Sequence, residues 1–184
     1  MKISEILTKH GTDKNNWNGR EGHCFGETYD QLFSKFERDS SINILEIGVQ
    51  NGNSIGAWKE AFPNAFVCGI DIKDVRNPEY RKEELCFILG DVKNPSIKAQ
   101  VSDKKFDIMI DDGSHHLPDV IHFITHYLDL LSDNGYMIIE DTQHPNEWIN
   151  AIQPLIPQSH EMYVKDLRPV HNRYDDFLII IRKK

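Results

Sequence analysis

Apolar and polar positions divide the chain into short hydrophobic runs and longer segments with helical periodicity. A short continuous apolar run bounded by turn residues predicts a buried strand, and apolar positions three and four apart predict a helix. The predicted strands cover 43–49, 65–70, 85–89, 106–110, 136–139, 162–164 and 177–181. Helices are predicted near 55–62, 118–131 and 146–155. Strands that alternate with helices indicate a parallel α/β sheet with helices on both faces.

Acidic residues follow two of these strands. Asp111 and Asp112 come at the end of the strand at 106–110, and Glu140 and Asp141 follow the strand at 136–139. The helical segment between them makes this unit a crossover between parallel strands, which brings both carboxyl ends to the same edge of the sheet. Ligands of open α/β sheets bind at that edge. We therefore expect the carboxylates to converge at a ligand site.

Residues 1–40 precede the first core strand. A short amphipathic helix is predicted near 3–7 and a polar loop near 15–22, followed by a second helix rich in aromatic residues. A length of 184 residues with 39% hydrophobic content suits one domain with one core. We expect a single domain, 1–184, made of this N-terminal segment and a core at 41–184.

Charge limits the kinds of partner that are expected, and cysteine content indicates the compartment. Lys plus Arg number 21 and Asp plus Glu number 29, so the formal net charge is −8. Because there is also no basic run, nucleic acid and anionic membranes are not expected as partners. The cysteines Cys24, Cys68 and Cys86 are few and scattered, which favours reduced thiols in a cytoplasmic protein. No apolar stretch could span a bilayer, and the N-terminus lacks a signal-peptide pattern.

A predicted strand-to-helix turn carries two glycines, Gly48 and Gly52, after the acid Glu46. Glycine lets the backbone approach a ligand closely, and the next helix points its first N–H groups at it. Asp71 ends the next strand, where an acid can bind a ribose diol, and Asp91 follows the strand after that. The pattern predicts a nucleotide-type cofactor. The pattern is not the G-x-G-x-x-G of dinucleotide-binding turns. An acid in the strand also suits an amino-bearing cation. Both observations favour S-adenosylmethionine over NAD.

Asp112, Glu140 and Asp141 offer oxygen ligands at one edge of the sheet. Oxygen-only ligation suits a hard cation, Mg²⁺ first, and pairs of acids at adjacent strand ends would repel one another without a cation. His115 and His116 lie on the loop after Asp112. Either imidazole could accept the proton of a hydroxyl held by the metal. Spacing alone does not choose between them.

Four motifs together resemble a known family. They are Gly11-Thr12-Asp13-Lys14 with His23 and Tyr29 downstream, residues 45–52 with Ser54, residues 110–115, and Ile139-Glu140-Asp141. The chain is similar to the class I S-adenosylmethionine-dependent methyltransferases. Among these it resembles the metal-dependent sugar O-methyltransferases of macrolide and polyketide tailoring, the mycinamicin type. The motifs cover most of the chain, and their combination is specific although no single motif is.

This resemblance implies a Rossmann-like seven-stranded sheet with helices on both faces and the last strand antiparallel. It implies S-adenosylmethionine-dependent methylation of a sugar hydroxyl on a glycan or glycosylated molecule. It also implies Mg²⁺ on Asp112, Glu140 and Asp141, with His115 as general base, and the choice between Mg²⁺ and Mn²⁺ in the cell stays open. The resemblance and the glycine turn together predict these cofactor residues: Thr12, Lys14, Glu46, Gly48, Gly52, Ser54, Asp71, Asp91 and Asp111.

The acceptor stays open. Residues 142–145 replace the Ser-Tyr with which relatives often continue, and this segment should face the acceptor. A sugar site should be polar with an aromatic platform, for which Trp17, Trp148 and Tyr174 are candidates. A phenolic, catechol-like acceptor would use similar metal chemistry in a more apolar site.

Two other classes of protein compete with this interpretation. An NAD-linked oxidoreductase is disfavoured by the missing G-x-G-x-x-G and by the cluster of carboxylates. A non-catalytic domain that binds a partner is disfavoured because Asp112, His115, Glu140 and Asp141 are all present. We therefore expect a small-molecule or glycan acceptor, and the choice between monomer and homo-oligomer stays open.

Overall fold

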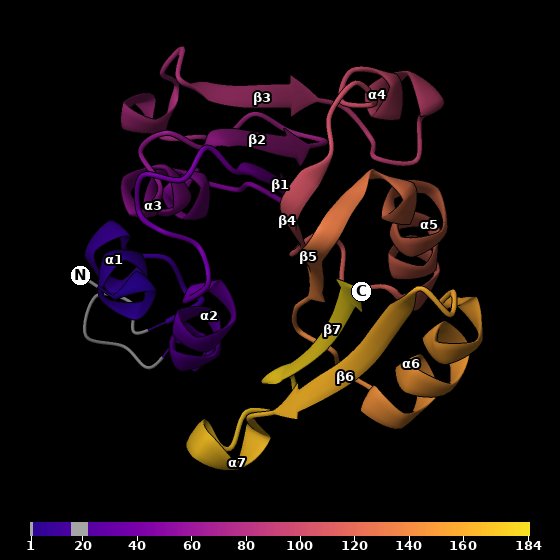
Figure 1. Cartoon of the computed structure of the whole chain (residues 1–184). Helices are drawn as coiled ribbons and strands as arrows, with labels where there is room; N and C mark the ends of the chain where they lie inside the picture. The colour runs from indigo at the N-terminus through magenta and orange to yellow at the C-terminus, as the bar shows by residue number, and fades with distance from the viewer. Residues whose placement is uncertain (1, 16–21) are drawn as a thin grey trace.

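A seven-stranded sheet forms the centre of the molecule (Figure 1). The computed structural model describes residues 2–15 and 22–184. The strands are β1 (Asn43–Ile47), β2 (Phe66–Asp71), β3 (Leu85–Leu89), β4 (Phe106–Asp111), β5 (Leu131–Ile139), β6 (His160–Asp166) and β7 (Phe177–Lys183). Their order is β3-β2-β1-β4-β5-β7-β6, and β7 runs antiparallel to both of its neighbours while the other pairs are parallel. The predicted fold class, with its antiparallel last strand, is confirmed.

Helices cover both faces of this sheet (Figure 1). One face carries α1 (Ile3–His10), α2 (Gly26–Phe33) and α3 (Asn53–Ala61), and the other carries α4 (Pro95–Ala99), α5 (Leu117–Tyr127) and α6 (Pro145–Ile152). The short helix α7 (Arg168–His171) precedes β7, and single 3₁₀ turns lie at η1 (Pro78–Tyr80), η2 (Leu128–Leu130) and η3 (Gln153–Leu155). Within the described ranges, no helix is both long enough and apolar enough to cross a membrane.

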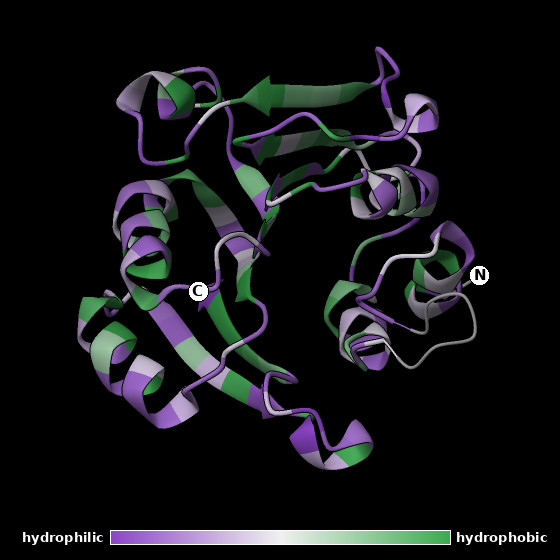
Figure 2. Ribbon diagram, turned by 180° about the vertical axis from the view of Figure 1, so that it is seen from behind, coloured by the Kyte–Doolittle hydropathy of each residue, from purple (hydrophilic) through white to green (hydrophobic). Residues whose placement is uncertain are grey.

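Each face has its own hydrophobic layer, because alternate residues of a strand point to opposite sides of the sheet. In β1, Ile44 belongs to the layer shared with α1, α2 and α3, whereas Leu45 and Ile47 belong to the layer under α5 and α6. Figure 2 shows mainly hydrophobic central strands between helices of mixed hydropathy. By the same alternation, Glu46 shares the face of Ile44 and points toward the N-terminal helices.

The N-terminal helices pack on α3 through aromatic side chains. Tyr29 and Phe33 of α2 meet Trp58 edge-on, with ring centroids 5.3 and 5.9 Å apart. Trp58 is fully buried. The aromatic residues of the predicted second helix therefore form part of the core. The division into a segment at 1–40 and a core at 41–184 stays a prediction.

Several elements differ from the prediction, since the helix predicted at 118–131 ends at Tyr127, α7 was not predicted, and β5 and α4 also differ. The strand predicted at 136–139 begins earlier, at Leu131, because Leu131 pairs with Phe106 before a register shift in the ladder between β4 and β5. Helix α4 was not predicted, since its pattern contains a single buried residue. Its start signal is nevertheless present: the side chain of Asn94 accepts the backbone N–H of Ser96 at 3.0 Å and caps the helix.

Candidate active site

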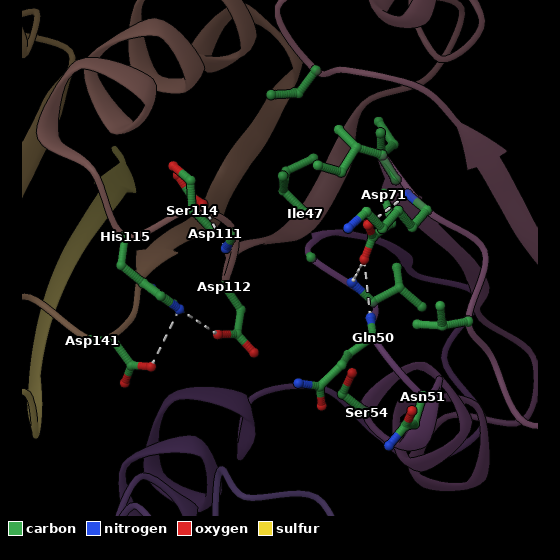
Figure 3. A pocket seen from close by; sticks show the side chains of 18 of the residues that line it. Ile47, Gln50, Asn51, Ser54, Asp71, Asp111, Asp112, Ser114, His115 and Asp141 are labelled. Carbon is green, nitrogen blue, oxygen red and sulfur yellow. Dashed lines mark hydrogen bonds and ion pairs between the residues drawn. The ribbon is translucent and has the colours of Figure 1, made fainter.

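A cavity of about 750 Å³ opens at the carboxyl ends of the parallel strands. The turn after β1, the ends of β2, β3 and β4, and residues 11–14 line it. Figure 3 shows Asp71 and the glycine turn on one side, which we call the turn end, and His115 with two acidic neighbours on the other, which we call the histidine end. The cavity thus joins the two sites that the sequence predicts.

At the turn end, the backbone follows a path that requires glycine at residue 48. Gly48 has a φ of +84°, and a Cβ there would lie 1.9 Å from the backbone oxygen of Asp112. Asp71 shapes the next residues, because its Oδ2 accepts the backbone N–H of Val49 at 2.8 Å and of Gln50 at 3.0 Å. The acid predicted to bind a ribose therefore also holds the glycine turn.

Most of the predicted cofactor residues line the cavity: Thr12, Lys14, Gly48, Ser54, Asp71, Asp91 and Asp111. Asp91 is exposed, whereas Asp111 is buried, and burial raises its pKa to about 7. Gly52 and Glu46 are not among the lining residues. Gly52 is covered by Tyr80, whose Cβ lies 2.7 Å from the position of a Cβ at residue 52, and Glu46 is fully buried.

Lys14 is the cationic partner of Glu46. Its Nζ lies 3.1 Å from Glu46 Oε1, 2.6 Å from Asp112 Oδ2 and 2.6 Å from Glu140 Oε2, and its side chain is 1% exposed. Burial lowers the pKa of Lys14, but the three carboxylates together outweigh burial and hold the pKa well above its ordinary value. The sequence indicates that Glu46 suits an amino-bearing ligand. In the structure, the amine that contacts Glu46 is the side chain of Lys14.

Glu140 belongs to the same buried network. Its Oε2 pairs with Lys14, and its Oε1 accepts a hydrogen bond from the hydroxyl of Tyr29. Burial raises the pKa of Glu140 well above its ordinary value, and Lys14 offsets part of that shift. The carboxylate faces Lys14 and Tyr29 and is not among the groups that line the cavity. Its assignment to a metal stays a prediction.

At the histidine end, His115 faces two acids. Its Nε2 lies 3.8 Å from Asp112 Oδ1 and 3.7 Å from Asp141 Oδ2 (Figure 3). We call these three residues, whose ligand atoms lie within 4.8 Å of one another, the acid–histidine cluster. Burial lowers the pKa of His115, and burial together with Asp112 raises the pKa of Asp141 to about 8. The exposed His116 is not among the lining residues, so the structure brings His115 to the site.

Asp141 has one carboxylate oxygen that lacks a hydrogen bond. Its Oδ1 is buried and finds no hydrogen-bond partner among residues 2–15 and 22–184. The backbones of His115 and Asp141 both adopt the left-handed region, with φ of +53° and +52°. Strain of this kind concentrates at functional sites. Two strand-end carboxylates, Asp112 and Asp141, that line one cavity form a donor set that fits a cation.

A second cluster beside Asp141 was missed by sequence reasoning. Nδ1 of His23 lies 2.6 Å from Asp176 Oδ1, and Arg173 donates from Nη2 to His23 Nε2 at 2.9 Å. Asp176 is fully buried. No local spacing links residues that lie 153 positions apart. The available signal was a pair of acids, Asp175 and Asp176, directly before an apolar strand.

The structure reduces the number of candidates for an aromatic platform that contacts the acceptor. Trp148 is only 3% exposed and belongs to the core, so its proposed contact with an acceptor was wrong. Helical periodicity explains its position, because Trp148 and Ile152 form the buried i, i+4 pair of α6. Tyr174 is 67% exposed and remains a candidate. Trp17 lies outside the described residues.

The sheet order, with the cavity at its carboxyl edge, defines a Rossmann-like methyltransferase fold. A similar solved structure is the MycE methyltransferase of the mycinamycin biosynthetic pathway in complex with Mg and SAH, with a TM-score of 0.76 and 23% identity over 100% of this chain and 55% of that chain. Another is a putative caffeoyl-CoA O-methyltransferase from Staphylococcus aureus, with a TM-score of 0.62 and 20% identity over 86% and 82% of the two chains. These likenesses establish the fold.

Curated relatives are sugar O-methyltransferases. The chain is 30% identical over 149 residues to L-olivosyl-oleandolide 3-O-methyltransferase of Streptomyces antibioticus, covering 76% of this chain and 37% of the relative. It is 29% identical over 150 residues to 8-demethyl-8-alpha-L-rhamnosyl tetracenomycin-C 2'-O-methyltransferase of Streptomyces olivaceus, covering 77% and 38%. The predicted resemblance is confirmed. The chain spans little more than a third of the length of these relatives, and no family model matches it.

Proposed function

We propose that this chain is an S-adenosylmethionine-dependent and Mg²⁺-dependent O-methyltransferase that acts on a sugar hydroxyl of a glycan or glycosylated molecule. The observation that carries the proposal is one cavity that joins the glycine turn and Asp71 to the acid–histidine cluster. The turn end suits a methyl donor, and the histidine end suits an acceptor hydroxyl. Similarity to sugar O-methyltransferases supports the same assignment.

The donor set at the turn end fits S-adenosylmethionine, which would supply an electrophilic methyl group. Its ammonium and sulfonium are cations and it carries no phosphate, so a lining with several acids favours it over a dinucleotide. The residues that would hold it are Thr12, Lys14, Gly48, Ser54, Asp71, Asp91 and Asp111. Glu46 and Gly52 would act from behind the cavity wall, Glu46 through Lys14.

Gly48→Ala is expected to lower thermal stability and to weaken S-adenosylhomocysteine binding roughly tenfold or more. A left-handed backbone costs a non-glycine residue about 1–3 kcal/mol, and a Cβ at residue 48 would overlap the backbone of Asp112. Gly113→Ala is the control, since its Cβ would meet Asp111 Oδ1 at 3.1 Å without a left-handed φ. Thermal unfolding and calorimetric titration compare the two, and equal effects would make Gly48 an ordinary turn residue.

The acid–histidine cluster fits Mg²⁺ or Mn²⁺. Carboxylate oxygens are the ligands that hard cations prefer, and the ligand atoms of Asp112, His115 and Asp141 lie within 4.8 Å of one another. A cation bound by Asp112 and Asp141 would make an acceptor hydroxyl more acidic and orient it beside His115. We propose Glu140 as a further ligand, which requires one of its oxygens to exchange Lys14 or Tyr29 for the metal.

His115 is the proposed general base. Because burial keeps its pKa below the ordinary value, the imidazole is neutral at pH 7 and can accept a proton. Nε2 is the nitrogen that faces Asp112 and Asp141, so the hydroxyl proton moves to Nε2. The two carboxylates would then stabilise the imidazolium, and the deprotonated acceptor oxygen would form a bond to the methyl carbon of bound S-adenosylmethionine as its S–CH₃ bond breaks and S-adenosylhomocysteine leaves.

The surroundings of the cluster favour a sugar over a phenol. A third acid, Asp175, lies near the cluster. Burial has the largest effect on the pKa of both His115 and Asp141, and the charge of Asp175 also raises each pKa. Tyr174, next to Asp175, is exposed and can offer a ring face. Sugar hydroxyls need hydrogen-bond partners when they leave water, and these polar groups can provide them.

We also propose that the enzyme works in the cytoplasm as one domain, in which the segment at 1–40 covers the cofactor end. Its thiols Cys24, Cys68 and Cys86 are free, which suits a reducing compartment. Lys14 is the point at which the N-terminal segment contacts the predicted metal ligands.

A methyl-transfer assay tests the proposed function. Purified protein is incubated with methyl-labelled S-adenosylmethionine and a panel of rhamnosides and olivosides, with and without a chelator. We expect label in a sugar methyl ether, loss of transfer with the chelator, and recovery with Mg²⁺. A panel of catechols runs in parallel. Transfer to catechols alone would contradict the sugar assignment, and transfer that ignores the chelator would contradict the metal.

A further inference from the structure

His23 is held rigidly beside Asp141. Its ring stacks on Phe25, with centroids 4.8 Å and planes 20° apart, and the residue is 6% exposed. Its Nδ1 lies 2.6 Å from Asp176 Oδ1, and its Nε2 lies 2.9 Å from Nη2 of Arg173. An imidazole with a partner on each nitrogen and a ring on one face cannot reorient, so its N–H has a fixed direction.

The partners of His23 also fix its tautomer. A guanidinium only donates hydrogen bonds, so Nε2 must accept from Arg173 and the proton must reside on Nδ1. The Nδ1–H then faces two oxygens, Asp176 Oδ1 at 2.6 Å and Asp141 Oδ1 at 3.3 Å. The second of these is the buried oxygen of Asp141 that makes no hydrogen bond. His23 is therefore the polar group that faces this oxygen.

The two oxygens of Asp141 have different surroundings. Oδ2 lies 3.7 Å from Nε2 of His115, at the open cavity, and Oδ1 lies against His23. The side-chain torsions of Asp141 determine which of its two oxygens faces the cavity. The fixed N–H of His23, 3.3 Å from Oδ1, favours the torsions that place Oδ2 at the cavity.

We propose that His23 is a positioning residue for Asp141. Its Nδ1–H, oriented by Phe25, Arg173 and Asp176, attracts Oδ1 across 3.3 Å and directs Oδ2 toward the cavity. The inference rests on the proposed function, since Asp141 is a proposed metal ligand there. Partners of metal ligands typically contribute 10–100-fold in metal affinity. The alternative is that the hydrogen bond between His23 and Asp176 has only a structural role. It would then connect the N-terminal segment to the start of β7, and its loss would leave metal affinity unchanged.

Two substitutions of His23 distinguish the positioning role from a purely structural role. In His23→Asn the amide nitrogen can take the place of Nδ1, whereas in His23→Gln it can reach only the place of Nε2. Electron paramagnetic resonance of free Mn²⁺ measures metal affinity in each. We expect His23→Asn to bind Mn²⁺ within about threefold of the unmodified protein and His23→Gln to bind it about 10–100-fold more weakly. His144→Gln, at an exposed histidine near Asp141, is the control.

Equal Mn²⁺ affinities for His23→Gln and the unmodified protein would overturn the inference, as would equal losses in both variants. If neither variant folds, ¹⁵N spectra of the imidazoles in the unmodified protein decide. The Nδ1–H tautomer is expected for His23, and a proton on Nε2 would overturn the inference. Mn²⁺ binding that depends on His23, without any binding of S-adenosylhomocysteine, would instead contradict the proposed function alone.

Discussion

Replacing Lys14 by methionine is expected to lower the free energy of unfolding by roughly 3–5 kcal/mol, the typical cost of removing one partner from a buried ion pair. The ammonium lies within 3.1 Å of Glu46, Asp112 and Glu140. Glu46 and Glu140 are 0% and 2% exposed. Methionine fills most of the same volume, but it leaves these carboxylates close together in the interior without a counter-ion.

Lys9→Met is the control for Lys14→Met. Lys9 makes an equally short contact, 2.7 Å from Nζ to Glu60 Oε1, but its side chain is 59% exposed. Exposed pairs contribute about 0–1 kcal/mol. Urea unfolding of both variants measures the difference, and Glu46→Gln added to Lys14→Met should recover part of the loss because it removes one uncompensated charge. Equal losses for the two lysine variants would contradict a buried counter-ion role for Lys14.

His115→Asn is expected to reduce turnover by about 10²–10⁴-fold, the usual contribution of a general base, while S-adenosylhomocysteine affinity stays within about twofold. Asparagine tolerates the left-handed φ of +53° at this residue, so the loss can be assigned to the missing base rather than to backbone strain. Steady-state methyl transfer gives the turnover, and calorimetry gives the affinity.

The matched variant for His115→Asn is His116→Asn, one residue further along the same loop. His116 is exposed and is not among the residues that line the cavity. Its replacement should change turnover by less than about twofold. A larger loss for His116→Asn than for His115→Asn would move the base role to His116.

The alternation of strands with helices and the edge that carries the site could be predicted because both follow from local pattern, whereas the antiparallel last strand was implied only by the family resemblance. Apolar runs locate the strands, and acids at 111–112 and 140–141 directly follow two of them. Parallel crossovers then bring the strand ends together without any knowledge of side-chain packing. The acid–histidine cluster formed by Asp112, His115 and Asp141 is the direct result.

The buried polar networks could not be predicted in the same way, because their members are far apart in the chain. Lys14 and Asp112 are separated by 98 positions, and His23 and Asp176 by 153. Alternation in β1 shows that Glu46 and Ile44 share a face, but it does not show that the lysine of the N-terminal segment meets Glu46 there. Such contacts depend on how α1 and α2 pack on α3, which pattern alone does not determine.

Calorimetric titration of the purified protein with S-adenosylhomocysteine, and in parallel with NAD, each with and without Mg²⁺, tests the central claim most directly. We predict that S-adenosylhomocysteine binds and NAD does not, because the turn end is lined by acids and its glycines do not form a pyrophosphate site. Binding of NAD alone would contradict the assignment to methyl transfer and return the site to redox chemistry.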